Sequence, residues 1–113
     1  MARAFNLGAV EGDTVTALTA AGTTQGTATT ITASHAIFTT VTSSAYGGIL
    51  KLLDAGEESW VANADTVEPL YIYPPSGCQF NGRTANLHAV IPAGKSACFK
   101  FINSTQIIAV ISA

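Results

Sequence analysis

The sequence Ser96-Ala97-Cys98-Phe99-Lys100-Phe101-Ile102 decides the fold class, because its apolar and polar side chains alternate. Successive side chains of an extended chain point to opposite faces, so the two phenylalanines share one face, and the serine and lysine share the other. Asn103-Ser104-Thr105 then turns the chain into a second apolar segment, Gln106-Ile107-Ile108-Ala109-Val110-Ile111. Together the two segments predict an antiparallel hairpin that closes the domain.

Strand signals extend over the rest of the chain, where Thr, Val and Ile fill the segments between clusters of Gly, Pro and Asn. These β-branched residues favour strands. The best helical segment, residues 49–54, lies between Gly47-Gly48 and Gly56 and is too short for a stable helix. We expect strands at 15–20, 27–33, 36–42, 48–53, 59–64, 68–73, 86–91, 96–102 and 106–112.

The turn signals recur at a spacing typical of sandwiches and barrels. The sequence therefore predicts an all-β fold, a single antiparallel β-sandwich of jelly-roll-like form with an extended N-terminal arm. We expect residues 1–33, rich in Thr and Ala, to form this arm or edge strands, and residues 34–113 to form the sandwich core domain. A flat, Thr-rich edge invites pairing with another chain, so the arm either presents an exposed Thr face or packs on a neighbouring subunit.

Composition narrows the classes of function. The 113 residues suffice for one domain, and 48% are hydrophobic, whereas only 11% are charged, against roughly 25% in ordinary domains. The five basic residues are scattered, which argues against nucleic-acid binding. The longest apolar run, residues 107–111, is too short to span a membrane. Residues 1–6 contain no apolar segment of a signal peptide, so we expect synthesis in a cytoplasm.

Residues that carry catalytic chemistry are few. His88 alternates with apolar residues in its strand, and the adjacent Glu57-Glu58 pair points to opposite faces. Gly77 and Gly82 have the spacing of a phosphate loop but lack the Lys that must follow. We therefore expect no cofactor, no metal and no small-molecule substrate, and we predict that the protein is not an enzyme. A small hydrolase that uses His35 or His88 is the weakest alternative.

The apolar and aromatic residues suggest a surface for other subunits instead. Tyr71 and Tyr73 share one strand face, which indicates core or subunit-interface packing, with a sugar-stacking platform as the alternative. The final segment is apolar on both faces, so it is a central strand or lies at an interface. The predicted interface with other subunits comprises Tyr71, Tyr73, Phe80, Ile107, Ile108 and Val110.

Three motifs follow one another in residues 47–113. A strand ends in Tyr73-Pro74-Pro75-Ser76-Gly77, the turn Asn81-Gly82 follows, and Ala93-Gly94-Lys95-Ser96-Ala97-Cys98-Phe99 precedes the last strand. This order resembles small virion proteins of tailed bacteriophages, above all the capsid cement or decoration proteins. The first 46 residues are not part of the resemblance.

The resemblance implies a structural role without catalysis. A cement protein binds the major capsid protein on the outer surface of the virion and stabilises the shell, commonly as a homotrimer. Icosahedral shells offer threefold sites that a closed trimer fits. We expect these partners and this location, with no binding to nucleic acid or membranes. The alternative is a receptor- or glycan-binding domain of a phage tail fibre or spike.

Overall fold

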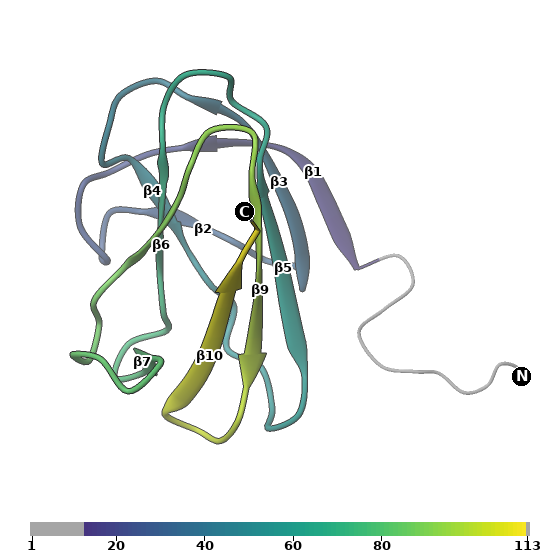
Figure 1. Ribbon diagram of the computed structural model, residues 1–113, viewed down its shortest axis with the longest axis vertical. Coiled ribbons are helices and arrows are strands. Elements are labelled where there is room, and N and C mark those ends of the chain that lie inside the picture. Colours follow the sequence, from purple (N-terminus) through teal and green to yellow (C-terminus); the bar gives the residue numbers. More distant parts are fainter. Residues whose placement is uncertain (1–12, 113) are drawn as a thin grey trace, which may run out of the picture.

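The computed structural model describes residues 13–112, in which it shows ten strands and no helix (Figure 1). The all-β prediction is therefore confirmed. The strands are β1 (Thr14–Ala20), β2 (Thr29–Thr30), β3 (His35–Val41), β4 (Gly47–Ile49), β5 (Glu58–Asn63), β6 (Leu70–Tyr73), β7 (Gln79–Phe80), β8 (Ala89–Ile91), β9 (Ser96–Phe101) and β10 (Gln106–Ile111).

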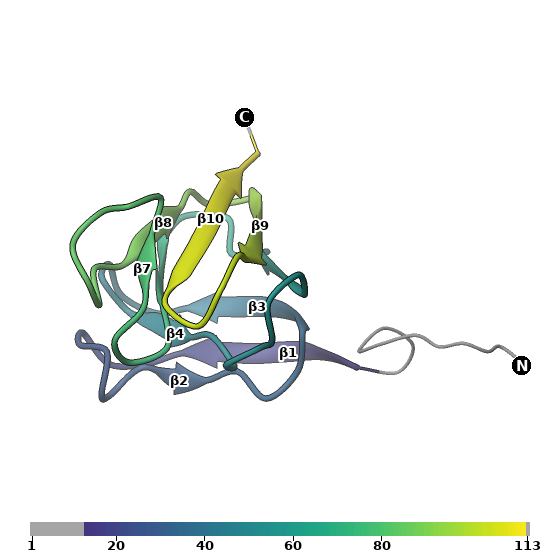
Figure 2. The ribbon, with the colours of Figure 1, turned by 90° about the horizontal axis from the view of Figure 1, so that it is seen from below.

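The strands form two sheets. The larger has six strands in the order β1-β3-β5-β9-β10-β7, and the smaller has four in the order β2-β4-β6-β8. Figure 2 shows β1 beside β3 and β9 beside β10, which are neighbours in the larger sheet. Their inward side chains meet in one core, in which Phe38, Phe99 and Phe101 are fully buried.

The first half of the chain has a solenoid-like course. β1, β3 and β5 run parallel in the larger sheet, and β2, β4 and β6 run parallel in the smaller one. The chain passes from one sheet to the other after each strand, so Thr14, His35 and Trp60 take equivalent places in successive coils.

The expected antiparallel, jelly-roll-like arrangement is therefore wrong for this half of the domain. Alternation with period two identifies a half-buried strand but not the direction of its neighbour. The antiparallel pairs lie in the second half, where β9 pairs with both β5 and β10, and β8 pairs with β6. The predicted hairpin is confirmed, with Ile107 opposite Phe101 and Ile111 opposite Ala97.

Two glycines in β4 make room for other groups, Gly47 within the smaller sheet and Gly48 between the two sheets. A Cβ atom on Gly47 would collide with the carbonyl oxygen of Tyr71 in the neighbouring strand. A Cβ atom on Gly48 would meet the ring of Phe38, which reaches across from the larger sheet. β4 is thus a strand that lacks side chains where the core needs the space.

The Thr-rich N-terminal stretch takes part in both sheets. β1 forms one edge of the larger sheet and pairs with β3, whereas β2 forms an edge of the smaller sheet. The part of the expected arm that comprises residues 1–12 lies outside the described residues. Within residues 14–30 the observed pairing is with the chain's own strands.

Candidate functional site

The outward face of the six-stranded sheet carries a row of side chains from five adjacent strands. The strand register places Thr14 beside His35, His35 beside Trp60, and Trp60 beside Cys98. The row ends on β10, where Cys98 lies opposite Val110. One transverse line across the sheet therefore brings together residues that are almost a hundred positions apart in the sequence.

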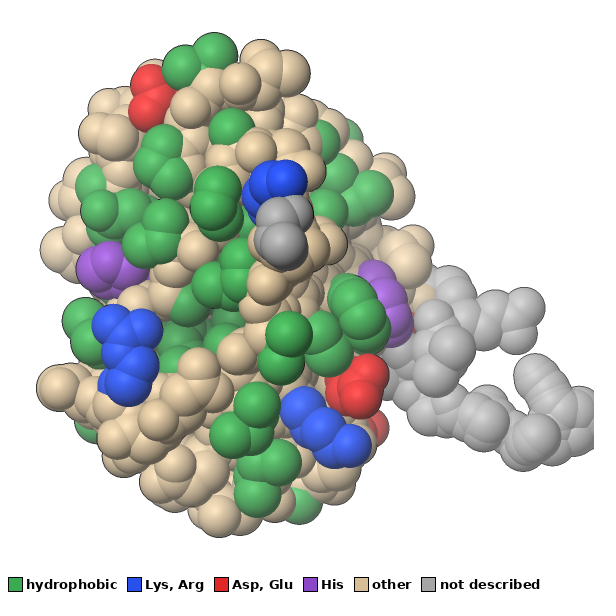
Figure 3. All heavy atoms as spheres, in the orientation of Figure 1, with side chains coloured by type: hydrophobic (Ala, Val, Ile, Leu, Met, Phe, Trp, Pro, Cys, Tyr) green, Lys and Arg blue, Asp and Glu red, His purple; other side chains and the backbone are tan. Residues whose placement is uncertain are grey.

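This face exposes large apolar side chains. Trp60 is 45% exposed, Val110 63%, Ile108 43% and Ile37 37%. Figure 3 shows hydrophobic side chains over the face formed by β9 and β10, with few charged groups among them. Monomeric proteins scatter such residues singly, whereas a group of them on one sheet face marks an interaction surface. We call these four residues the apolar row.

Opposite charges lie beside the apolar row. Glu58 on β5 is in register with Lys100 on β9, which in turn is opposite Ile108 on β10. These are the charged side chains at the described strand positions of this face. Because one is acidic and one is basic, the charges of Glu58 and Lys100 offset each other.

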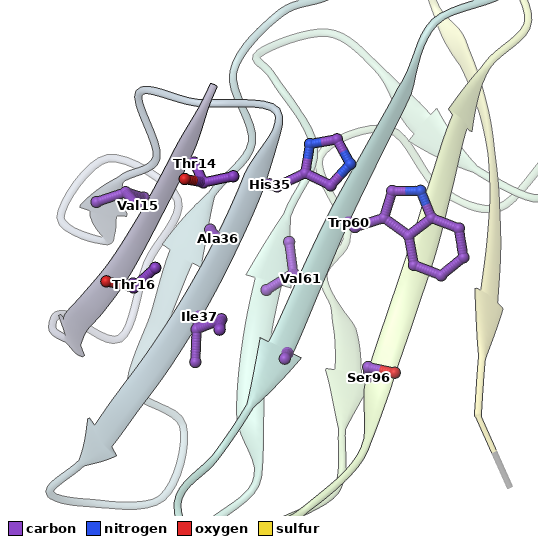
Figure 4. Close-up of a pocket in the computed structure, with 10 residues that line it drawn as sticks. Thr14, Val15, Thr16, His35, Ala36, Ile37, Trp60, Val61 and Ser96 are labelled. Atoms are coloured by element: carbon purple, nitrogen blue, oxygen red, sulfur yellow. The ribbon is translucent and has the colours of Figure 1, made fainter. Parts of the chain in front are cut away.

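A groove of about 280 Å³ lies next to the apolar row, between β1 and Trp60 (Figure 4). Small side chains such as Ala62, Ser96 and Thr16 line it together with Ile37. The Trp60 indole projects to the β9 side of this groove, and the side chains of β1 lie on the opposite side. The face therefore combines a protruding aromatic ring with an adjacent hollow.

A short polar chain lies at the end of the groove. The Ser34 hydroxyl is 3.0 Å from Nδ1 of His35, and the Ser34 amide donates to Asp13 Oδ2 at 3.0 Å. Hydrogen bonds from the hydroxyl and the amide of Ser34 hold the pKa of the Asp13 carboxyl below its usual 3.8. Ser34 is only 1% exposed, so its hydroxyl is not accessible to a substrate. These hydrogen bonds hold the starts of β1 and β3 together and do not form a nucleophile with its base.

Both cysteines are free thiols. Burial raises the pKa of Cys78, whose Sγ donates to the carbonyl of Ser104 at 3.4 Å. Burial, and then the adjacent Glu58 carboxylate, raise the pKa of Cys98. A raised pKa keeps a thiol protonated at neutral pH, and the protonated thiol is a poor nucleophile and metal ligand.

A second aromatic cluster lies on the smaller sheet. The Tyr71 and His88 rings stack with centroids 4.0 Å apart, and Tyr73 meets His88 edge-on at 5.5 Å. Burial, and then the positive charge of Arg83, lower the pKa of His88, so its imidazole is neutral at neutral pH. Tyr73 is 6% exposed and donates its hydroxyl to the Thr23 carbonyl at 3.1 Å. The cluster is a packed structure in which the rings cover each other.

The six residues of the predicted interface occupy three places. Ile108 and Val110 lie on the exposed face of the larger sheet, whereas Tyr71 and Tyr73 belong to the aromatic cluster. Phe80 and Ile107 fill the core of the same chain, with the Phe80 ring 5.1 Å from that of Phe99.

Trp60 and Ile37 complete the face and were missed by the sequence analysis as interface residues. Adjacent residues of a strand point to opposite faces, so a strand that buries Val61 must expose Trp60. This alternation was the signal available in the sequence.

Comparison with protein-family models, with curated proteins and with solved structures found no match. Among residues 13–112 no group of three or more His, Cys, Asp or Glu side chains is arranged to hold a metal ion. The same part of the chain contains no helix that is long and apolar enough to cross a membrane.

Proposed function

We propose that this protein is a capsid decoration protein of a tailed bacteriophage, which binds the outer shell and stabilises it. Two lines of argument support the proposal. The motif order of residues 47–113 resembles that of virion cement proteins, and the apolar row gives the domain a surface suited to burial in an assembly. The protein acts by structure in this proposal and carries out no reaction.

The apolar row is the observation that carries the proposal. Covering Trp60 and Val110 removes apolar area from water, and each Å² of such area contributes about 25 cal/mol to association. An isolated, freely dissolved domain gains nothing from keeping these side chains on a flat sheet face. A subunit that is held between other proteins gains stability from them. Since the face carries one positive and one negative side chain, it adapts to a surface of either sign.

A receptor- or glycan-binding domain is the second candidate, and the aromatic cluster bears on it. Sugar recognition by stacking needs an aromatic ring with an open face. His88 covers a face of Tyr71, and Tyr73 is buried. Among the aromatic side chains of residues 13–112, Trp60 is the exposed one, and it stands among aliphatic side chains. This arrangement favours a protein partner over a sugar.

Immunogold labelling of purified particles tests the proposal. Label spread over the heads is expected for a decoration protein, whereas label confined to the tail tip would favour the receptor-binding candidate. The absence of label from particles would exclude a virion role.

The stabilising role needs a second measurement, which compares the thermal melting of shells with and without the protein. Shells that contain the protein should melt at higher temperature. Shells that carry the Trp60→Ser variant at the same occupancy serve as the matched control. Equal melting with and without bound protein would contradict a cementing role, even if the label were on the head.

A further inference from the structure

The face of the larger sheet carries both parts of a self-complementary contact. The protruding part is Trp60, 45% of whose surface is exposed. The hollow part is the groove of about 280 Å³ beside it, which Ile37, Ala62 and Ser96 line. The Trp60 ring of the same chain forms one wall of this groove and projects toward β9, so it leaves the groove open (Figure 4).

A twofold axis that lies in the plane of contact, between Trp60 and the groove, brings each protruding ring to the groove of the other copy. Contacts of this kind are isologous, since one patch meets the same patch on the partner. Two sheets that pack face to face lie about 10 Å apart with interdigitating side chains, which is the geometry of a sandwich core. The alternation of a large Trp60 with the small Ala62 on one strand suits this interdigitation.

The charges of the face are compatible with a second copy. Glu58 and Lys100 are neighbours in the register, so each copy presents one negative and one positive group side by side. A twofold arrangement sets no block of like charges against itself. A strongly charged face would repel its own copy, whereas on this face the charges of Glu58 and Lys100 offset each other.

The size of the face is also sufficient. The five longer strands β1, β3, β5, β9 and β10, of six or seven residues each and about 4.8 Å apart, give a plan area on the order of 500 Å², before side-chain relief is added. The smallest stable specific interfaces bury roughly 600 Å² per partner. Relief from side chains such as Trp60 and Val110 raises the accessible area above the plan area.

From these observations we infer that two copies of the chain pair face to face through the larger sheet, with Trp60 of each copy seated in the groove of the other. The pairing does not depend on a place in the virion, but it covers the same apolar row that the proposed function offers to the shell. The pairing therefore competes with binding of this row to the shell. It competes with the threefold assembly that the resemblance implies. The pair leaves the smaller sheet and its aromatic cluster free for other contacts.

The test uses the full chain in solution and its single tryptophan. Light scattering over a dilution series should show twice the 11.6 kDa of the chain at high concentration and the single mass on dilution. Tryptophan emission should shift to longer wavelength over the same range, because Trp60 leaves the groove as the pair dissociates.

Ile37→Lys and Val90→Lys are the matched variants, since the two residues are 37% and 39% exposed on strands of different sheets. Ile37→Lys should raise the dissociation constant of the pair about tenfold or more, whereas Val90→Lys should leave it unchanged. If Ile37→Lys does not fold, Thr16→Arg at the exposed rim of the groove takes its place.

Several outcomes would overturn the pairing. One is the 11.6 kDa mass of one chain at every concentration, together with Trp60 emission typical of exposure. Another is the mass of one chain with a shielded Trp60, which would mean that another part of the same chain covers the groove. A threefold mass would replace the pair with a trimer. Shielding of Trp60 only on addition of virus shells would assign the groove to the shell protein. None of these results depends on where the label falls on particles.

Discussion

The side-chain amide of Asn81 pairs with the backbone of Ala109 as a residue of a neighbouring strand would. Asn81 Nδ2 donates to the Ala109 carbonyl at 3.3 Å, and the Ala109 amide donates to Asn81 Oδ1 at 3.0 Å. The short strand β7 pairs with β10 only at Gln106 and Ile107, so Asn81 continues the pairing beyond the end of β7. An exposed strand edge is a template for aggregation, and this amide blocks part of it.

Replacing Asn81 with Gly removes the amide while it preserves the left-handed backbone, where Asn81 has φ of 53°. We expect the free energy of unfolding to fall by about 1 kcal/mol, since two partly exposed hydrogen bonds are lost. Urea unfolding measures this loss. Asn81→Asp keeps the acceptor for the Ala109 amide and should show an intermediate loss. If Asn81→Asp were no more stable than Asn81→Gly, the oxygen that accepts from the Ala109 amide would have no role in stability.

Gly47 and Gly26 form a pair of glycines with opposite surroundings. A Cβ atom at Gly47 collides with the backbone of Tyr71, whereas one at Gly26 has no atom within 4 Å. Gly47→Ala should therefore lower the free energy of unfolding by about 3 kcal/mol, because backbone on both strands must shift. Gly26→Ala should be neutral within about 0.5 kcal/mol. Similar thermal melting of the two variants would show that β4 tolerates a side chain at this position.

The glycines illustrate which parts of the fold the sequence predicts. The alternation in residues 96–101 was sufficient for β9, because its period matches burial on one face alone. A strand was expected at 48–53, but the observed β4 covers Gly47–Ile49 and includes both glycines, since the space beside them is filled by Phe38 and Tyr71. That space depends on contacts between distant segments, which local propensity does not contain.

The parallel coils and the candidate site were harder to predict for the same reason. The crossovers between β1, β3 and β5 pass through strands as short as Thr29–Thr30, which leave almost no periodic signal. The apolar row could be predicted for Ile108 and Val110, which alternate with the buried Ile107. Its extension to Trp60 follows from the register of β5, β9 and β10, and the sequence does not specify that register.

Ser59 and Asn63 are both buried polar residues of β5, each 1% exposed, but their hydrogen bonding differs. Ser59 Oγ has no hydrogen-bond partner, whereas the Asn63 amide donates to the carbonyls of Glu68 and Ile91 and accepts from the Asp65 amide. Ser59→Ala should raise the free energy of unfolding by about 1 kcal/mol, because it removes an unsatisfied hydroxyl from the core.

Asn63→Ala should lower the same quantity by about 3 kcal/mol, since it removes the donor to the Ile91 carbonyl, a buried bond, and to the Glu68 carbonyl, a partly buried one. Chemical denaturation of both variants checks this contrast. A loss of stability in Ser59→Ala would mean that packing around the hydroxyl outweighs its missing hydrogen bond.

Asp65 links the stability of the fold to acid. Its carboxylate accepts the amides of Glu68 at 2.8 Å, Val67 at 3.0 Å and Val41 at 3.1 Å, and these bonds hold its pKa below 3.8. A carboxyl whose pKa is lowered by folding stabilises the folded state fully above its unfolded pKa. The contribution is lost as the pH falls through the lower folded value.

Asp65→Asn should therefore melt at lower temperature than the wild type at neutral pH, because one amide oxygen replaces two carboxylate oxygens. The difference should shrink as the pH falls below about 4, where the carboxyl of the unfolded chain takes up its proton, and it should be lost as the pH falls through the lower folded pKa. Melting curves at a series of pH values measure this convergence. A constant difference across the series would locate the acid sensitivity elsewhere.

Ile107 and Ile108 are adjacent in β10, yet they face opposite sides of the sheet, with 0% and 43% exposure. Ile107→Asp buries a carboxylate in the core and should unfold the domain, since the cost exceeds about 4 kcal/mol. Ile108→Asp places the charge on the exposed face beside Lys100, where water still solvates it, so the domain should fold. It should nevertheless abolish assembly, because the face then carries a net negative charge and loses an apolar contact. Circular dichroism measures whether the variant folds, and light scattering measures whether it assembles. A folded Ile108→Asp variant that assembles like the wild type would show that β10 lies outside the contact.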